Sequence, residues 1–246
     1  MASRFSLAPG ARATADFIGN EREPLLQVDT MIANPEALVE LAATSQFAPA
    51  YGPNGGYPGL RARAPRDYVE TILRSLGGPI IEAFRLGSVT LARVDSAYSV
   101  ATLPPDRLVP AQRAPHVDTT HAWQFAILHY LCPAELGGTA FYRHRATGFE
   151  TLTEERVAAY QAARAQEDFG VGYIDDRDRW FERISEVPAS FNRLVVYRSH
   201  LFHSGQILAP DRLSPDPRQG RLTLNIFATF APAGPSSERA VPPSGA

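Results

Sequence analysis

The chain has 246 residues, of which 44% are hydrophobic and 20% charged, with a net charge of −2. This composition is typical of a folded globular protein and excludes a chain that is disordered throughout. All 24 basic residues are arginines, so a Schiff-base lysine and a P-loop lysine are excluded, and the 26 acidic residues that balance them argue against a nucleic-acid partner. The single Cys132 excludes an intramolecular disulfide and any multi-cysteine metal site.

Nothing in the sequence predicts a membrane association. The first residues lack the apolar core of a signal peptide, and no apolar stretch is long enough to span a bilayer. We therefore expect a cytoplasmic protein with no membrane partner. The sequence does not indicate an oligomeric state.

The first third of the chain, residues 1–87, reads as helical. Asn34, Pro35 and Glu36 form a helix start, with Asn34 as the N-cap. A second helical stretch covers residues 66–84 and is interrupted at Gly77-Gly78-Pro79. The glycine- and proline-rich segment 48–58 between these helices predicts an irregular loop.

From Ser88 the sequence changes to short segments rich in β-branched and aromatic residues, bounded by Pro or Gly. A helix over residues 154–167 interrupts them, with Thr151 and Glu154 spaced as a capping box. The predicted strands cover residues 88–100, 122–131, 139–142, 180–187, 193–197 and 221–230. This pattern favours an α+β fold with a mainly β core, a sandwich or a barrel, and helices packed outside it. We expect one domain over residues 1–230, with a β core from 88 to 230, and a flexible tail over 231–246.

His116 and Asp118 are two residues apart, so on an extended strand both side chains point to one face. A second histidine from another strand would complete a facial triad of two imidazoles and one carboxylate, as in non-haem iron(II) oxygenases. His203 is the natural candidate, and His200, three residues earlier, is its rival. His129 alternates with Tyr130 and is interpreted as structural.

Arg221 opens the last predicted strand, and alternation places it on one face with Thr223 and Asn225. A guanidinium with a hydroxyl two residues away can bind a carboxylate. A strand-end arginine that reaches solvent or a local acid remains the alternative.

Together these motifs resemble, over residues 88–230, the iron(II)/2-oxoglutarate-dependent oxygenases in their prolyl-hydroxylase-like branch. The matching pieces follow in order as Pro115-His116-Val117-Asp118, Ile127 to Leu131, Gly137-Gly138-Thr139, residues 193–203, and Arg221-Leu222-Thr223. The resemblance implies a double-stranded β-helix, a jelly-roll barrel open at one end. It also implies Fe(II) on His116, Asp118 and His203, and 2-oxoglutarate on Arg221, Thr223 and Tyr130.

In this family Fe(II), 2-oxoglutarate and O2 hydroxylate a C–H bond, releasing succinate and CO2. A small residue replaces the carboxylate ligand in halogenating members, so Asp118 favours hydroxylation. We expect an amino acid, peptide or small metabolite as substrate. A metal-dependent hydrolase that uses the same His/Asp/His site and a non-catalytic jelly-roll binding module remain open.

The segment 48–58 also carries a substrate hypothesis. Tyr51 and Tyr57 lie among glycines and prolines, and Arg61 and Arg63 follow at once. The segment could close over the barrel mouth, with Arg61 or Arg63 contacting an anionic or polar substrate group. A solvent-exposed turn with scattered charges is the alternative interpretation.

Overall fold

The computed structural model describes residues 4–233. Two antiparallel sheets dominate it: an eight-stranded sheet in the order β1-β2-β9-β6-β11-β5-β4-β3, and a three-stranded sheet in the order β10-β7-β8. The strands are β1 Ala13–Ile18, β2 Glu23–Val28, β3 Ala48–Gly52, β4 Gly55–Arg63, β5 Val89–Ala101, β6 Gln124–Tyr130, β7 Thr139–His144, β8 Phe181–Val187, β9 Leu194–Arg198, β10 His203–Gly205 and β11 Leu222–Pro232. The predicted tail lies mostly outside the described residues.

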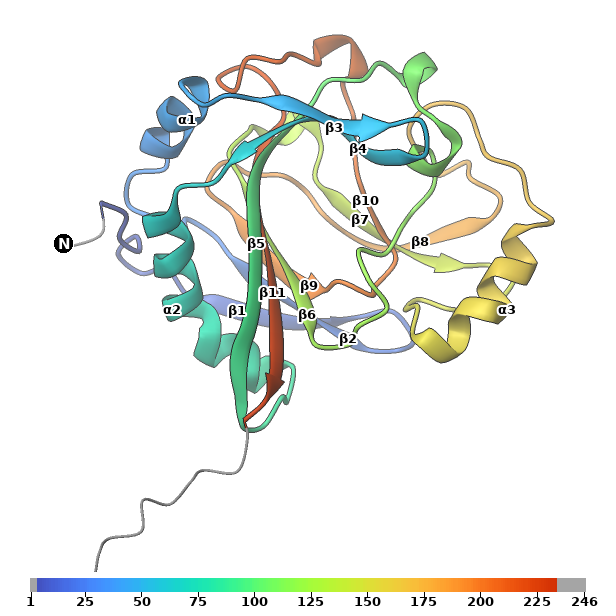
Figure 1. Ribbon diagram of the computed structural model, residues 1–246, viewed down its shortest axis with the longest axis horizontal. Coiled ribbons are helices and arrows are strands. Elements are labelled where there is room, and N and C mark those ends of the chain that lie inside the picture. The colour runs from blue at the N-terminus through green and yellow to red at the C-terminus, as the bar shows by residue number, and fades with distance from the viewer. Residues whose placement is uncertain (1–3, 234–246) are drawn as a thin grey trace, which may run out of the picture.

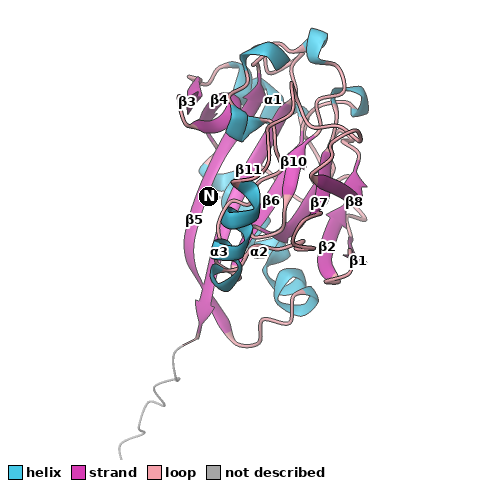
Figure 2. Cartoon of the chain, turned by 90° about the vertical axis from the view of Figure 1, so that its right-hand side faces the viewer, coloured by secondary structure: helices cyan, strands magenta, loops and turns pink. Residues whose placement is uncertain are grey.

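Three helices accompany the sheets: α1 Glu36–Ala43, α2 Arg66–Ala83 and α3 Glu154–Arg164. α1 and α2 lie on the side of the molecule opposite α3 (Figure 1). The view turned by 90° shows the small sheet beside the large one (Figure 2). No helix within residues 4–233 is long and apolar enough to cross a membrane. With eleven strands and three α-helices, the described part of the molecule is mainly β, as predicted.

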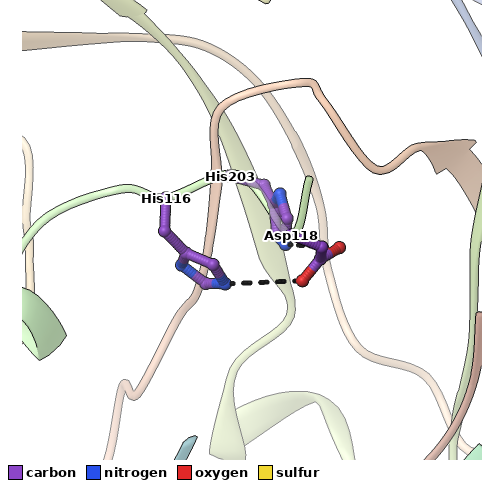
Figure 3. A group of neighbouring side chains, drawn as sticks. All are labelled: His116, Asp118 and His203. Atoms are coloured by element: carbon purple, nitrogen blue, oxygen red, sulfur yellow. Dashed lines mark ion pairs between the residues drawn. The ribbon is translucent and has the colours of Figure 1, made fainter. Parts of the chain in front are cut away.

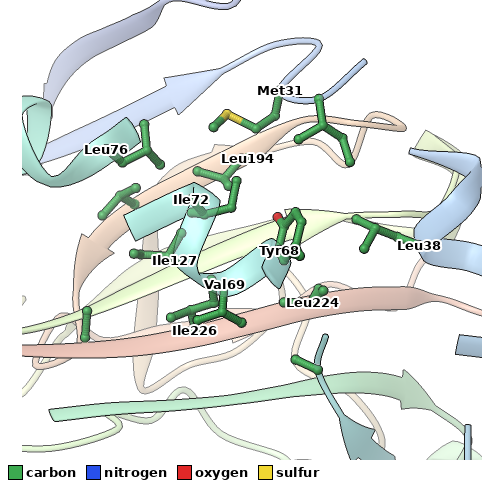
Figure 4. Packing of buried hydrophobic residues seen from close by; sticks show 14 of the residues in the cluster. Met31, Leu38, Tyr68, Val69, Ile72, Leu76, Ile127, Leu194, Leu224 and Ile226 are labelled. Carbon is green, nitrogen blue, oxygen red and sulfur yellow. The ribbon is translucent and has the colours of Figure 1, made fainter. Parts of the chain in front are cut away.

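The largest apolar cluster lies between the large sheet and its two helices. Tyr68, Ile72 and Leu76 of α2 pack on Ile127 of β6 and Leu224 of β11 (Figure 4). A second cluster lies between the large and small sheets and includes Tyr197 and Phe141. Alternation along each strand divides the side chains between these two clusters, so the polar residues of the inner face line a site between the sheets.

The strands predicted after Ser88 are confirmed to within about two residues at each end. The prediction for residues 1–87 is wrong in part, because β1 to β4 also lie there. Segment 48–58 is a hairpin rather than an irregular loop: Tyr51 pairs with Gly56, and Gly56 has φ 98°. Glycine adopts this conformation readily, and a Cβ on Gly56 would lie 2.5 Å from the Ala50 carbonyl oxygen.

The helix ends also differ from prediction. α2 continues through Gly77, Gly78 and Pro79, because Leu76 and Ile80 keep both sides of the proline packed in the core. α1 begins without a bond from Asn34, since its N-cap is Pro35.

The predicted capping box of α3 is absent as well. The Thr151 hydroxyl, one member of that box, donates to Glu21 at 2.5 Å, and the N-cap of α3 is Thr153.

Candidate metal and cosubstrate site

Three predicted ligands meet between the two sheets. One ligand atom from each of His116, Asp118 and His203 lies within 4.8 Å of the others (Figure 3). The Asp118 carboxylate oxygens are 3.8 Å from His116 Nε2 and 3.7 Å from His203 Nε2. These three groups therefore face one small volume.

Backbone bonds bring the two ligand segments together. His116 and His203 exchange both backbone N–H···O bonds, at 3.0 and 2.9 Å, and Asp118 N donates to Ser199 O at 2.8 Å. His116 forms an isolated bridge rather than part of a regular strand. The positions of the three ligands are thus set by pairing between segments more than 80 residues apart.

The protonation of the site suits metal binding. His203 Nδ1 lies 2.8 Å from the Leu201 carbonyl oxygen, which can only accept, so Nδ1 carries the proton and Nε2 is free as a ligand. Burial lowers the pKa of His203 to about 4. Partial desolvation, and then the neighbouring His203, lowers the pKa of His116, whose side chain is 54% exposed. Both imidazoles are therefore neutral at pH 7, the form that binds metal.

His200 does not join this group. It is buried, and its Nε2 lies 3.9 Å from the Glu23 carboxylate. Neither ring nitrogen has a hydrogen-bond partner within residues 4–233. His203 is the histidine beside His116 and Asp118.

Arg221 lines the same cavity and is 3% exposed. Its Nε and Nη2 donate to the carbonyl oxygens of Gly137 and Gly138 at 3.0 and 2.5 Å. No carboxylate pairs with it in the described part of the chain. A buried guanidinium with only neutral acceptors is costly, which favours an anionic ligand here.

Thr223 and Asn225 line the cavity beside Arg221, as the alternation predicts. Tyr130 is buried, and its hydroxyl donates to Thr139 Oγ1 at 2.7 Å, so Thr139 stands between Tyr130 and the cavity. Sequence reasoning assigned no role to Thr139. Its position directly after Gly137-Gly138 was the available signal.

The hairpin contributes to this cavity. Tyr57 and Arg61 line it, whereas Arg63, also exposed, does not. Tyr173, from the segment after α3, lines an adjoining hollow that shares Arg61, Asp118 and Arg221 with this cavity. No sequence signal marked Tyr173, because its segment has neither periodicity nor a motif.

His129 faces the opposite side of the sheet. Its Nδ1 lies 2.7 Å from the Tyr68 hydroxyl, and its Nε2 lies 3.0 Å from Asn192 Oδ1. Burial lowers its pKa to about 4. Its structural interpretation is confirmed.

Solved structures with a similar fold include two proteins from nogalamycin biosynthesis and the protein HygX. The α-ketoglutarate-dependent epimerase SnoN is 16% identical with TM-score 0.45, covering 92% of this chain and 88% of its own. The carbocyclase SnoK is 15% identical with TM-score 0.47, covering 85% and 80%. HygX from Streptomyces hygroscopicus, solved with nickel and 2-oxoglutarate, is 11% identical with TM-score 0.49, covering 85% and 83%.

No curated protein matches the sequence. A family model does match, over residues 9–228, which is most of the chain. The chain therefore belongs to the Family of unknown function (DUF6445).

Proposed function

We propose that this protein is a non-haem Fe(II)/2-oxoglutarate-dependent oxygenase that hydroxylates a C–H bond of an amino acid, peptide or small metabolite. One observation carries the proposal: His116, Asp118 and His203 share a cavity with the buried, acid-free guanidinium of Arg221. A metal triad and a carboxylate-binding arginine in one cavity are what a metal-chelating dicarboxylate requires.

The donor set fits iron(II). His116, Asp118 and His203 would hold the ion through two neutral imidazoles and one carboxylate, a donor set that leaves coordination positions for other ligands. Bound Fe(II) and 2-oxoglutarate would supply O2 activation, with 2-oxoglutarate converted to succinate and CO2. The retained carboxylate of Asp118 supports hydroxylation rather than halogenation.

The chain's own residues would orient the metal-binding and cosubstrate-binding side chains and bind 2-oxoglutarate. Leu201 O holds the His203 ring through its Nδ1 proton, and Gly137 O and Gly138 O hold the Arg221 fork. Arg221, with the Thr223 hydroxyl beside it, would bind the far carboxylate of 2-oxoglutarate. Tyr130 would support this subsite through Thr139.

The core is proposed to be a double-stranded β-helix within one domain over residues 1–230. The placement of the cavity supports this architecture: its lining comes from β4, β6, β9 and β11 of the large sheet and from β7 and β10 of the small one. The two sheets flank the site: His203 and Arg221 are buried there, and the side chain of His116 is 54% exposed at its open side.

Succinate formation tests the proposal. The Fe(II)-loaded protein should convert 2-oxoglutarate to succinate when O2 is present, and the Zn(II)-loaded protein should not. A metal-dependent hydrolase or a binding module would form no succinate with either metal. Folded, iron-loaded protein with no succinate above an Fe(II)-only blank would contradict the proposal.

A further inference from the structure

A second polar group lies on the inner face of the large sheet, beside the proposed cosubstrate subsite. Ser99 of β5 pairs with Arg61 of β4 on one side and Thr223 of β11 on the other. The Ser99 hydroxyl oxygen accepts from Arg61 Nε at 3.2 Å and from Asn225 Nδ2 at 2.9 Å. Three strands thus contribute a hydrogen-bonded row, Arg61–Ser99–Asn225, in which Arg61 and Asn225 line the cavity and the fully buried Ser99 joins them behind its wall.

Both ends of this row have unused bonding capacity. Asn225 is 7% exposed, and its Oδ1 is buried with no hydrogen-bond partner within residues 4–233. The Nη groups of Arg61 make no hydrogen bond or ion pair in the same part of the chain. A buried acceptor without a donor costs free energy, which a ligand N–H or O–H would recover.

The charges in the cavity favour an anion. Arg61 and Arg221 both line it, and Asp118 is the carboxylate among its lining residues. On the proposed function, Fe(II) and doubly charged 2-oxoglutarate cancel each other. One guanidinium then remains without a counter-charge, and Arg61 is the more exposed of the two.

We infer that the Arg61–Ser99–Asn225 row binds the primary substrate, a small carboxylic acid that carries an N–H or O–H donor close to its carboxylate. The Arg61 fork binds the carboxylate, and Asn225 Oδ1 accepts from the donor. Arg61 and Asn225 contact the same Ser99 oxygen, so they are close enough to bind neighbouring groups of one molecule. A single missing negative charge matches a carboxylate better than a phosphate ester. This inference rests on the proposed function and adds its substrate class.

The test uses protein loaded with Ni(II) and 2-oxoglutarate and a matched panel of ligands. The panel holds L-amino acids, N-acetyl-L-amino acids and 2-hydroxy acids, each with its carboxamide, and a set of phosphate monoesters. Thermal shift and calorimetry measure binding, and succinate release by the Fe(II) form measures coupling. At least one acid should bind and stimulate succinate release, and its carboxamide should do neither.

Variants locate the binding to the row. Arg61→Gln should lower the affinity for the acid about 10- to 100-fold, and Arg61→Lys should recover part of this loss. Asn225→Ala should also lower the affinity for this acid. Arg63→Gln, two residues along β4 and outside the cavity, is the matched control and should bind like wild type.

The outcomes separate this inference from the proposed function. Wild type that fails to bind 2-oxoglutarate with Ni(II) contradicts the proposed function. If wild type does bind 2-oxoglutarate, any of three results overturns the substrate inference alone. These are that no acid is preferred over its carboxamide, that phosphate esters bind best, or that Arg61→Gln binds the acid with unchanged affinity.

Discussion

The guanidinium of Arg221 is held at its base by two backbone carbonyl groups and has no acid beside it among residues 4–233. We predict that Arg221→Ala weakens 2-oxoglutarate binding by about 2–4 kcal/mol, because one partner of a buried charge pair is lost. Arg221→Lys should recover only part, since the fork geometry is lost. Calorimetry on metal-loaded protein measures the effect, and circular dichroism checks the fold. Unchanged 2-oxoglutarate affinity in Arg221→Ala would exclude this role.

Measurement of the bound metal tests the proposed metal ligands. Asp118→Ala and His203→Ala should each weaken Fe(II) binding by more than the roughly 10–100-fold that loss of a supporting residue costs. His200→Gln should keep the metal, because His200 lies away from the triad. Metal analysis after anaerobic reconstitution gives the answer. Loss of iron in His200→Gln together with its retention in His203→Ala would reverse the assignment.

His129 makes stability depend on pH. Burial lowers its pKa to about 4, whereas in the unfolded chain it is about 6.5. The unfolded state therefore binds more protons between these values, and stability falls as pH falls through this range. Between pH 7 and pH 5, one such group lowers the free energy of unfolding by about 2 kcal/mol.

Urea unfolding of wild type and His129→Gln at both pH values isolates this contribution. The variant should lose about 2 kcal/mol less than wild type between pH 7 and pH 5. Equal losses in the two proteins would show that His129 does not titrate in this way.

At the scale of elements, α3 contains no fully buried residue, so its attachment depends on a few contacts. Glu167, three residues after its end and 2% exposed at the side chain, accepts from His144 Nε2 at 2.8 Å and pairs with Arg164. We predict that Glu167→Ala lowers the free energy of unfolding by about 2–4 kcal/mol, because it leaves buried polar groups unpaired. Glu154→Ala, on the exposed first turn, should change it by less than about 0.5 kcal/mol. Similar effects of both variants in urea unfolding would refute this account.

The sequence predicted the later strands well and the early ones poorly, for a physical reason. Segments 122–131 and 221–230 are long, apolar on one face and bounded by turn residues. The hairpin residues Pro49 and Gly56 are poor strand formers, and β3 and β4 form at the edge of the sheet, where pairing with β5 compensates for weak local preference. β10, with three residues, is too short to leave a periodic pattern.

The residues of the site likewise separate into those that the sequence could predict and those that it could not. His116 and Asp118 share a motif, and the Arg221-x-Thr223 spacing shows a common face, so these residues could be predicted. The contributions of Thr139 and Tyr173 could not, because they depend on how distant segments pack together. The choice between Arg61 and Arg63 likewise required the position of β4 against β5.

At the scale of the whole molecule, two sheets flank a cavity that is lined both by the His116, Asp118 and His203 triad and by the buried Arg221. The helices α1 and α2 cover the far face of the large sheet, which is apolar apart from groups such as His129, whereas Arg221, Thr223 and Asn225 lie on the inner face. This division between a packed face and a polar face is the structural basis of the functional proposal.

Anaerobic addition of Fe(II) and then 2-oxoglutarate tests that proposal most directly. Chelation of iron by 2-oxoglutarate should produce a weak visible charge-transfer absorption in wild type, because the triad holds the iron and Arg221 raises the affinity for 2-oxoglutarate. The absorption should vanish in His203→Ala and require more 2-oxoglutarate in Arg221→Ala. Folded wild-type protein that binds Fe(II) but shows no such absorption at saturating 2-oxoglutarate would contradict the account.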